Sequence, residues 1–292
     1  MQQLQQFINT YVPQIEAHMR AEITRLHAPA SLKESMQYSL DAGGKRVRPL
    51  YVLAVLSLFE QDVTKGLPIA SAIEMMHTYS LVHDDLPCMD NDDFRRGKPT
   101  NHKVYGEDVA VLAGDALNSL CFGIIARMEA PADVKVALID LLSTTAGAEG
   151  MVGGQVLDME GEKRTLNLEE LEQVHINKTG ALLRFSIESG AVLAQADAAT
   201  RAALVEYAHH IGLAFQIQDD ILDIEGTTEE LGKTAGKDVV SDKSTYPALL
   251  TLAGAKEKLN DHFEKAIAAL SQATVNTELL VEFAMYIVKR KN

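Results

Sequence analysis

Residues 84–97 read DDLPCMDNDDFRRG and follow an apolar stretch with helical periodicity. Five carboxylates fall within ten residues, and two adjacent arginines come after them. Like charges at this density repel one another and destabilise a fold unless a cation neutralises them. A run of charge is most often a solvated surface loop. A second copy argues for a site instead, because residues 219–223 read DDILD, again between an apolar stretch and a Gly/Lys-rich loop.

The rest of the chain has helical periodicity. Apolar residues recur every three or four positions, Ala and Leu are abundant, and Trp is absent. Capping boxes at Ser31/Glu34 and Asn167/Glu170 mark two helix starts. With no convincing strand pattern and no Pro/Ser-rich linker, the sequence predicts an all-α fold and a single domain over residues 1–292. The predicted helices are 2–26, 31–41, 50–59, 67–86, 108–128, 132–157, 167–190, 200–223, 246–268 and 276–289.

The composition excludes several classes of protein. The 41 acidic and 27 basic residues give a formal charge of −14, which argues against a nucleic-acid-binding protein. Cys88 and Cys121 have no zinc-site spacing and form no disulfide framework, which is typical of a reducing compartment. No signal peptide is visible, and no apolar run reaches the length needed to span a bilayer. We therefore expect a cytoplasmic protein without membrane insertion.

The two acidic motifs are far enough apart in sequence for their helices to be neighbours that face each other. Hard divalent cations prefer oxygen ligands, and Mg²⁺ takes one or two carboxylates while water and substrate phosphates complete its octahedron. Lys and Arg are frequent in the loops around both motifs, which suits a diphosphate. We therefore predict Mg²⁺ bound between the motifs by Asp84, Asp85, Asp90, Asp219, Asp220 and Asp223.

The helices that lead to the motifs are apolar, so the ligand is expected to carry a hydrocarbon chain as well as a diphosphate. Prenyl diphosphates have this structure. Cations draw electrons from the diphosphate and make it a better leaving group, which leaves an allylic carbocation. The Thr179 hydroxyl and the Gln216 amide could stabilise that cation as fixed dipoles, while an apolar cavity keeps water out.

Three further stretches could belong to such a site, and each also has a purely structural interpretation. Residues 43–49, GGKRVRP, are either a helix C-cap with solvent-facing bases or a phosphate pocket. His77 shares a helical face with Asp84, although a lone helical histidine is usually structural. Lys178 and Thr179 interrupt an apolar helix and could simply face water.

Together these residues resemble the trans-isoprenyl diphosphate synthases, and within them the short-chain bacterial farnesyl diphosphate synthases, over nearly the whole chain. The resemblance rests on residues 43–49, the first aspartate motif with its inserted Cys88-Met89 and Arg95-Arg96-Gly97, Gly153-Gly154-Gln155 with Asp158, Lys178-Thr179, Phe215-Gln216 with residues 219–223, and Gly232-Lys233 with Lys243. It implies a bundle of long, mostly antiparallel helices around a deep central cavity, normally a homodimer.

The resemblance also implies a reaction. Isopentenyl diphosphate would condense head-to-tail (1'-4) with dimethylallyl and then geranyl diphosphate through an allylic carbocation, and the departing diphosphate would take the proton. Mg²⁺, with three ions when substrate is bound and Mn²⁺ as an alternative, would hold the allylic diphosphate. The residues that match its binding site are Arg95, Gln155, Lys178, Lys233 and Lys243. Those that match the isopentenyl diphosphate site are Gly44, Lys45, Arg48, His77 and Arg96, and the catalytic set is Lys178, Thr179, Gln216 and Arg95.

Product length is expected to depend on the residues one turn before Asp84. A bulky Tyr79 would stop the chain at farnesyl length and a small Ser80 would leave room for an intermediate tail. In similar enzymes an aromatic residue here accompanies a fifteen-carbon product. The alternative is that Tyr79 only packs between helices.

Several other functions compete with farnesyl diphosphate synthesis. The nearest is a geranylgeranyl or geranyl diphosphate synthase. A terpene cyclase would not need the second diphosphate pocket at residues 43–49, and a non-catalytic prenyl synthase subunit should lack one acidic motif. A di-iron helical bundle requires paired Glu-x-x-His motifs, whereas Glu74 with His77 is the one clear example.

Overall fold

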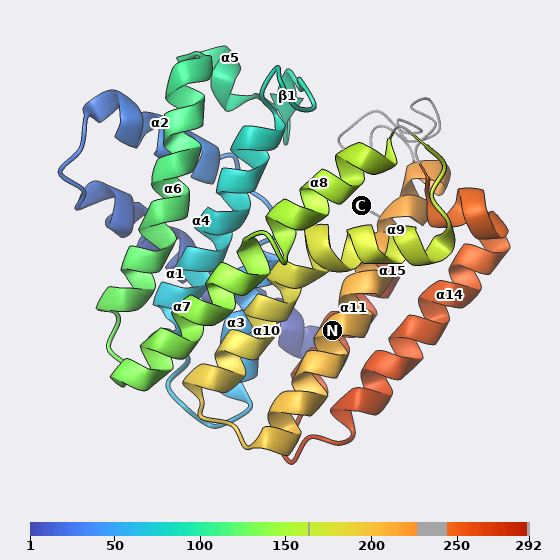
Figure 1. The fold of residues 1–292 in the computed structure, drawn as a ribbon. Coiled ribbons are helices and arrows are strands. Elements are labelled where there is room, and N and C mark those ends of the chain that lie inside the picture. Colours follow the sequence, from blue (N-terminus) through green and yellow to red (C-terminus); the bar gives the residue numbers. More distant parts are fainter. Residues whose placement is uncertain (163, 227–243, 291–292) are drawn as a thin grey trace.

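The structure is a computed structural model that describes residues 1–162, 164–226 and 244–290 (Figure 1). Within these ranges the chain is almost entirely helical, which confirms the predicted all-α class. The α-helices are α1 (Gln2–Thr24), α2 (Ala30–Leu40), α3 (Val47–Ser57), α4 (Leu67–Asp84), α5 (Asn101–Tyr105), α6 (Glu107–Arg127), α7 (Ala132–Ala146), α8 (Met151–Gly161), α9 (Leu168–His175), α10 (Ala181–Leu193), α11 (Ala198–Glu225), α14 (Tyr246–Leu270) and α15 (Glu278–Lys289). A short 3₁₀ turn, η1 (Val63–Gly66), precedes α4.

Helices α4 and α11, which carry the two acidic motifs, end at the same end of the bundle (Figure 1). Helix α4 packs against α3 and α6, and α11 packs against α10 and α14. Helix α10 in turn packs against α3 and α7. This arrangement gathers the acidic helix ends near α8 and α9, which cover the same end of the molecule (Figure 1).

The core holds this frame rigid. Helix α4 is apolar on most of its circumference, so it is buried among its neighbours rather than amphipathic. The hydroxyls of Tyr51 on α3 and Tyr207 on α11 lie 3.1 Å apart, and the Tyr207 hydroxyl donates to the Leu280 carbonyl on α15 at 2.9 Å. The Phe283 ring packs 4.6 Å from the Tyr51 ring. Three helices that are distant in sequence are thereby joined at one point.

The helix starts agree only in part with the predicted caps. The capping box at Asn167 and Glu170 is confirmed, with both reciprocal hydrogen bonds formed. The capping box predicted at Ser31 and Glu34 is wrong, because α2 starts one residue earlier and no side chain caps it. Pro29 precedes that helix, and its restricted φ of −52° already suits a helix entry.

The single helix predicted over residues 132–157 is wrong, because the chain forms α7 and α8 with a break at residues 147–150. A Cβ atom on Gly150 would lie 2.0 Å from the Thr145 carbonyl oxygen, and one on Gly147 would lie 2.5 Å from that of Ser143. Only glycine fits where the backbone returns this closely on itself. Because of the break, α8 is a separate helix from α7.

The helix predicted over residues 167–190 contains an irregularity. Between α9 and α10 lies η2 (Ile176–Gly180), a π-helical turn that holds Lys178 and Thr179. π-Turns are rare and occur mostly at functional sites. A π-helical turn contains one residue more than an α-helical turn. The periodicity gives no sign of this extra residue, because apolar positions continue on both sides of the turn.

A small hairpin follows the first acidic motif and was not predicted. Strands β1 (Phe94–Arg95) and β2 (Lys98–Pro99) pair antiparallel, with Arg95 opposite Lys98. The two residues between them, Arg96 and Gly97, have φ of 53° and 74°, as in the tight turns that favour glycine. The hairpin therefore directs two neighbouring arginines to different partners.

Helix α6 contradicts the expectation that no apolar run is long enough for a membrane span. Its 21 residues include a window of mean hydropathy 1.8, which passes by length and composition alone. One such helix is weak evidence, since a core helix of a soluble protein passes the same test. One face of α6, including Ala113, Leu117 and Cys121, is buried in the core.

Candidate active site

The first acidic motif lies where α4 ends. Asp84 is the last helical residue, and the backbone N–H of Asp90 donates to its carbonyl at 2.9 Å, which folds the motif into a compact turn. Asp85 is buried and accepts hydrogen bonds of 2.5–2.9 Å from the Arg95 guanidinium. Burial raises the pKa of Asp84 to about 6; Asp90 adds to the rise and Lys178 opposes it. A cation bound here would stabilise the ionised form of Asp84.

The second motif lies on the last turns of α11. Asp219 is half-buried, whereas Asp220 and Asp223 are buried. Asp220 accepts a hydrogen bond of 2.9 Å from the backbone N–H of Tyr246, at the start of α14. Asp219 also acts electrostatically on Lys45 and Arg48, which places it beside the loop at residues 43–48.

The carboxylates form no ready-made metal cage. Among the residues that the structure describes, no group of three or more His, Cys, Asp or Glu side chains could hold an ion by itself. The donor set still fits Mg²⁺, because that ion binds through one or two carboxylates and takes its other ligands from water and phosphate. The six ligands remain a prediction, and Asp84 and Asp90 are close enough to act on each other electrostatically.

Arg48 and His77 lie together beside the first motif and line one cavity. The buried Nε atom of Arg48 has no hydrogen-bond partner among the described residues. Burial lowers the Arg48 pKa, and the nearby Arg96 lowers it further. Burial and the surrounding arginines, first among them Arg48, hold the pKa of His77 well below its usual value, so this histidine is neutral. An anion bound here would accept a hydrogen bond from this buried donor and would offset the surrounding positive charge.

The hairpin and the Gly43–Arg48 loop meet through Arg96. Its guanidinium donates to the Gly43 carbonyl. A Cβ atom on Gly44 would lie 2.8 Å from that guanidinium, the movable end of a side chain, so the requirement for glycine comes from the backbone, whose φ is +133° at this position. Lys45 is exposed, but the surrounding protein still removes part of the water from its ammonium. This desolvation, together with Arg290, lowers the pKa of Lys45, and Asp219 opposes the shift.

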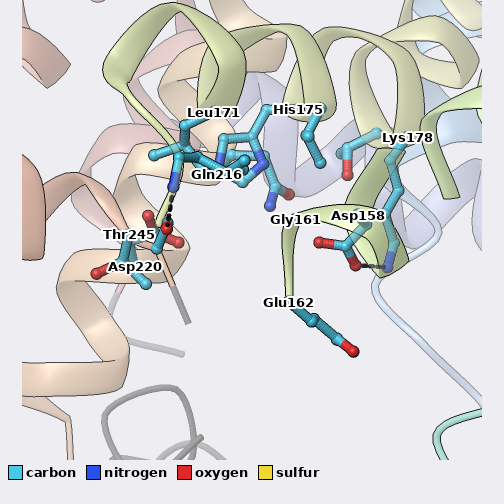
Figure 2. Close-up of a pocket in the computed structure, with 13 residues that line it drawn as sticks. Asp158, Gly161, Glu162, Leu171, His175, Lys178, Gln216, Asp220 and Thr245 are labelled. Carbon is cyan, nitrogen blue, oxygen red and sulfur yellow. Dashed lines mark hydrogen bonds and ion pairs between the residues drawn. The ribbon is translucent and has the colours of Figure 1, made fainter. Parts of the chain in front are cut away.

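Lys178 and Thr179 lie on the π-turn and face α8. The Lys178 ammonium forms a 2.6 Å ion pair with Asp158 (Figure 2). A Cβ atom on Gly154 would lie 2.2 Å from the Lys178 backbone nitrogen, so the glycine lets the two backbones approach. Asp158, Lys178, Gln216 and Asp220 surround a cavity of about 120 Å³ (Figure 2). Lys178 and Thr179 thus do not simply face water.

A larger cavity of about 470 Å³ adjoins the same π-turn. Most of its lining is apolar and comes from α4, α6 and α8, with a few charged groups. The lining residues are Arg48, His77, Tyr79, Ser80, Leu81, His83, Asp84, Leu86, Cys88, Met89, Val111, Met151, Val152, Gln155, Val156, Met159, Lys178, Thr179 and Leu182. The helical face predicted for His77 and Asp84 therefore does open onto one space.

Both residues predicted to set the product length line this cavity. The Tyr79 ring is half-buried and meets the His83 ring edge-on at 5.0 Å, so it packs between residues and also faces the cavity. The Ser80 hydroxyl donates to the His77 carbonyl at 2.9 Å. Their effect on chain length remains a prediction.

Some predicted residues lie elsewhere. Lys233 and Lys243 fall in residues 227–243, outside the described part of the chain. In the first acidic stretch, Asp93 is exposed and pairs with Lys103 at 2.7 Å, away from the cavity lining.

Sequence reasoning missed Arg290. Its side chain is 4% exposed, donates to Asp219 at 2.6 Å and to the Phe215 carbonyl at 2.9 Å, and lies 4.0 Å over the Phe215 ring. The only signal in the sequence was a basic C-terminal run. The contact needs α15 to pack against α11, which no local pattern predicts.

Comparison with known proteins gives consistent results. The model of the polyprenyl synthetase family matches residues 29–282. A farnesyl diphosphate synthase of Geobacillus stearothermophilus is 51% identical over 290 residues, or 98% of each chain. A chloroplastic geranylgeranyl pyrophosphate synthase of Catharanthus roseus is 48% identical over 270 residues, covering 90% of this chain and 75% of that one.

A solved structure supports the same assignment. An FPP/GFPP synthase from Zymomonas mobilis superposes with a TM-score of 0.87 at 37% identity, covering 98% of this chain and 99% of that one. The family model and these relatives span most of the sequence, and the structural match covers 98% of the chain. The chain therefore belongs to the polyprenyl synthetase family.

Proposed function

We propose that this protein is a prenyltransferase that makes (2E,6E)-farnesyl diphosphate by successive 1'-4 condensations of isopentenyl diphosphate with dimethylallyl and geranyl diphosphate. The observation that carries the proposal is the cavity of about 470 Å³, which is largely apolar yet includes Arg48, His77, Asp84 and Lys178. A prenyl chain and a diphosphate need such a combination. Relatives named farnesyl diphosphate synthase support the product.

The allylic diphosphate occupies the space between the acidic motifs. Asp84, Asp85, Asp90 and Asp219 would hold it through Mg²⁺, with three ions as the expected number and Mn²⁺ as a substitute. The metal neutralises the diphosphate and makes it a better leaving group. Lys178 lies beside Asp84 and is oriented by its 2.6 Å pair with Asp158, so its ammonium can donate to a phosphate oxygen.

The chemical step then needs little from acid or base side chains. The C1–O bond of the allylic substrate breaks, and its electron pair leaves with the diphosphate. The double bond of isopentenyl diphosphate attacks C1, and the departing diphosphate takes the proton that is lost from the new cation. The Thr179 hydroxyl and the Gln216 amide stabilise the cation as dipoles, while the apolar wall excludes water.

Isopentenyl diphosphate binds at the cationic loop. Lys45, Arg48 and Arg96 supply positive charge, and neutral His77 adds a hydrogen-bond donor. The Nε atom of Arg48, which has no hydrogen-bond partner in the described part of the chain, supports this role. A terpene cyclase has no use for this second anion site, which argues against that alternative.

A direct assay tests the proposal. The purified protein is incubated with isopentenyl and dimethylallyl diphosphates, with Mg²⁺ or with EDTA, and the products are identified by chromatography and mass spectrometry. We expect farnesyl diphosphate, and only with metal. Asp84→Asn should lower turnover by about 10²–10³-fold, because charge stabilisation of the leaving group is lost.

Asp93→Asn is the matched control in the same acidic stretch and should retain activity, since Asp93 pairs with Lys103 on the surface. Geranylgeranyl diphosphate as the main product would replace the farnesyl assignment, an alternative that the relative from Catharanthus roseus supports. Absence of any metal-dependent elongation would overturn the proposal altogether.

We also propose that the chain is a single domain that acts as a cytoplasmic homodimer. One core cluster includes residues from Leu4 to Ile287, which supports one domain. On α6 and α7, Leu112 is 57% exposed and Val136 is 65% exposed, and a second copy could cover these apolar side chains. Light scattering should give twice the monomer mass of 31.9 kDa, and a monomer at micromolar concentration would contradict this.

A further inference from the structure

The Gly43–Arg48 segment, a loop that continues into the first turn of α3, holds three cations, and one of them faces away from the cavity. Lys45 is exposed and Arg48 lines the large cavity. The Arg46 side chain between them is only 1% exposed and faces the protein interior. We infer that Arg46 is a positioning residue: with Glu74 it holds this loop so that Lys45 and Arg48 converge on isopentenyl diphosphate.

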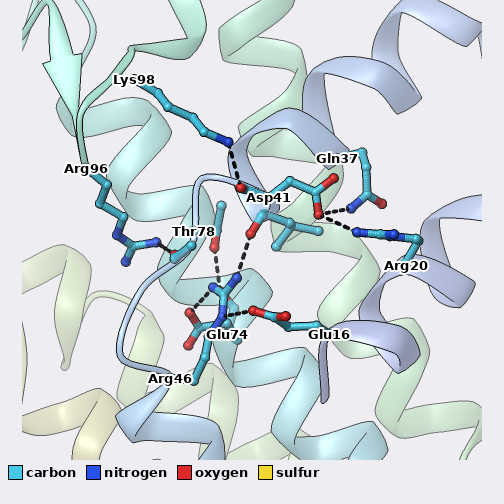
Figure 3. A network of polar contacts seen from close by, with 11 residues as sticks. Glu16, Arg20, Gln37, Asp41, Arg46, Glu74, Thr78, Arg96 and Lys98 are labelled. Carbon is cyan, nitrogen blue, oxygen red and sulfur yellow. Dashed lines mark hydrogen bonds and ion pairs between the residues drawn. The ribbon is translucent and has the colours of Figure 1, made fainter. Parts of the chain in front are cut away.

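The contacts of Arg46 use its whole guanidinium (Figure 3). Nη1 donates to Glu74 at 2.7 Å, Nε donates to Glu16 at 3.2 Å, and Nη2 donates to the Leu40 carbonyl at 2.7 Å. Glu74 is itself 2% exposed. The planar fork of arginine can satisfy these acceptors at once, which a lysine ammonium cannot do in the same geometry.

The backbone conformation of Arg46 explains why its side-chain contacts matter. Its φ is +51°, in the left-handed region that side-chain-bearing residues rarely adopt. This conformation lies between the loop and the start of α3, so it sets the directions of Lys45 and Arg48 relative to each other. Such a strained residue persists only where its surroundings hold it.

The partner carboxylate connects the loop to the site. Glu74 lies on α4, one helical turn before His77. Glu74 acts electrostatically on Arg48, and Arg48 acts electrostatically on His77. A shift of the loop relative to α4 would therefore separate Arg48 from His77. Arg96 and Lys98 hold the same loop from its outer side, through the carbonyls of Gly43 and Asp41 (Figure 3).

A buried ion pair is seldom kept for stability alone. Replacing both partners by apolar residues is often neutral, whereas removing one partner leaves an uncompensated buried charge. This difference allows a test that separates positioning from folding. The inference rests on the proposed function, because it assigns the loop to isopentenyl diphosphate.

The test compares Arg46→Met, Glu74→Leu, the double variant and Arg46→Lys with the wild type. Both single variants should unfold at lower temperature, and the double variant should recover most of the loss. We expect the KM for isopentenyl diphosphate to rise roughly tenfold or more in the double variant, with the KM for dimethylallyl diphosphate changed less than about twofold. Arg46→Lys, which keeps the charge but not the fork, should be intermediate.

Arg20→Met is the matched control. Arg20 belongs to the same polar network through Asp41 at 3.0 Å, but the pair is exposed and contributes little (Figure 3). Neither KM should change. A double variant with restored melting temperature and an unchanged KM for isopentenyl diphosphate overturns the inference, as does an equal rise in both KM values.

A binding measurement keeps the two proposals distinguishable. Calorimetry without divalent metal measures the affinity of inorganic diphosphate for the loop cations, independently of turnover. Wild type that binds diphosphate but makes no prenyl product would overturn the proposed function alone. If the double variant then binds diphosphate about tenfold more weakly than wild type, the positioning role stands, and equal affinity overturns it.

Discussion

Arg290 joins the second acidic motif from the far end of the chain. It donates to Asp219 and stacks over Phe215, and it also lowers the pKa of Lys45, where burial is the first cause. One buried arginine thus lies between the second acidic motif and the Gly43–Arg48 segment. The large cavity is lined by two neighbouring side chains of different size, Tyr79 and Ser80.

Tyr79→Ala should lengthen the product from farnesyl toward geranylgeranyl diphosphate. The half-buried ring lines the cavity, so its removal opens space for another isoprene group. Ser80→Phe should act in the opposite direction and favour geranyl diphosphate. Product analysis by chromatography measures both effects.

Tyr11→Ala serves as the control, because Tyr11 packs against Phe7 on α1 and does not line the cavity. Its products should match those of the wild type. An unchanged product distribution in Tyr79→Ala would show that the ring only packs between helices.

At the scale of elements, the backbones of the π-turn η2 and helix α8 approach each other closely at Gly154. Gly154 lets α8 reach the backbone of Lys178, and Asp158 on the next turn of α8 orients the Lys178 ammonium. The hairpin has a comparable role, since it sends Arg95 to Asp85 and Arg96 to Gly43.

Gly154→Ala should impair both stability and catalysis. The new Cβ atom would lie 2.2 Å from the Lys178 nitrogen and 2.6 Å from the Asn177 carbonyl carbon, and backbone atoms cannot move aside cheaply. Overpacking of this kind costs about 1–3 kcal/mol, and Lys178 should move away from its productive position. Urea unfolding and kcat measure the two effects.

Gly123→Ala is the matched control on α6. Its Cβ atom would meet only the mobile end of the Arg127 side chain at 2.7 Å. Alanine is favoured over glycine by up to about 1 kcal/mol inside a helix, so this variant should be neutral or stabilised. If the two glycine variants behave alike, close approach at Gly154 is not a functional requirement.

At the scale of the whole molecule, α11 and α14 form an extensive contact that supports the second acidic motif. Within it the Nδ1 atoms of His210 and His262 lie 3.0 Å apart, and Glu206 pairs with His210 at 3.1 Å. His262 is buried, and Lys258, Asp261 and Lys265 also act on it electrostatically. Two adjacent imidazoles cannot both take a proton without repelling each other.

The protein should lose stability as the pH falls from about 6.5 to about 4. Burial, with a smaller contribution from His210, lowers the pKa of His262 to about 4. The unfolded chain, with a histidine pKa near 6.5, therefore binds more protons than the folded protein in this window. The free energy of unfolding decreases as the pH decreases through the window, and above it this group has no effect on stability. One such group contributes about 1.4 kcal/mol per pH step, or ~3 kcal/mol over the window.

His262→Gln tests this by removing the titrating group. Urea unfolding between pH 7 and pH 4 should show a pH dependence smaller by ~3 kcal/mol than in the wild type. His27→Gln is the control, because His27 is exposed between α1 and α2. An equal pH dependence in wild type and His262→Gln would mean that the buried pair does not resist protonation.

The sequence alone determined the all-α class, the two acidic motifs, the family resemblance and most candidate site residues. These follow from local periodicity and from short motifs, whose chemistry depends on neighbours in the chain. Asp84 and His77 could be assigned to one helical face because three to seven residues of helix fix their relative direction. The capping box at Asn167 could be predicted for the same reason.

Only the tertiary structure decided the remaining features. Arg290 meets Asp219, Arg46 turns inward to Glu74, and Gly154 touches the π-turn, because helices distant in sequence pack against one another. The break at residues 147–150 and the π-turn likewise depend on backbone contacts that periodicity does not record. Local sequence determines which face a side chain lies on, whereas its partner depends on the packing of the whole bundle.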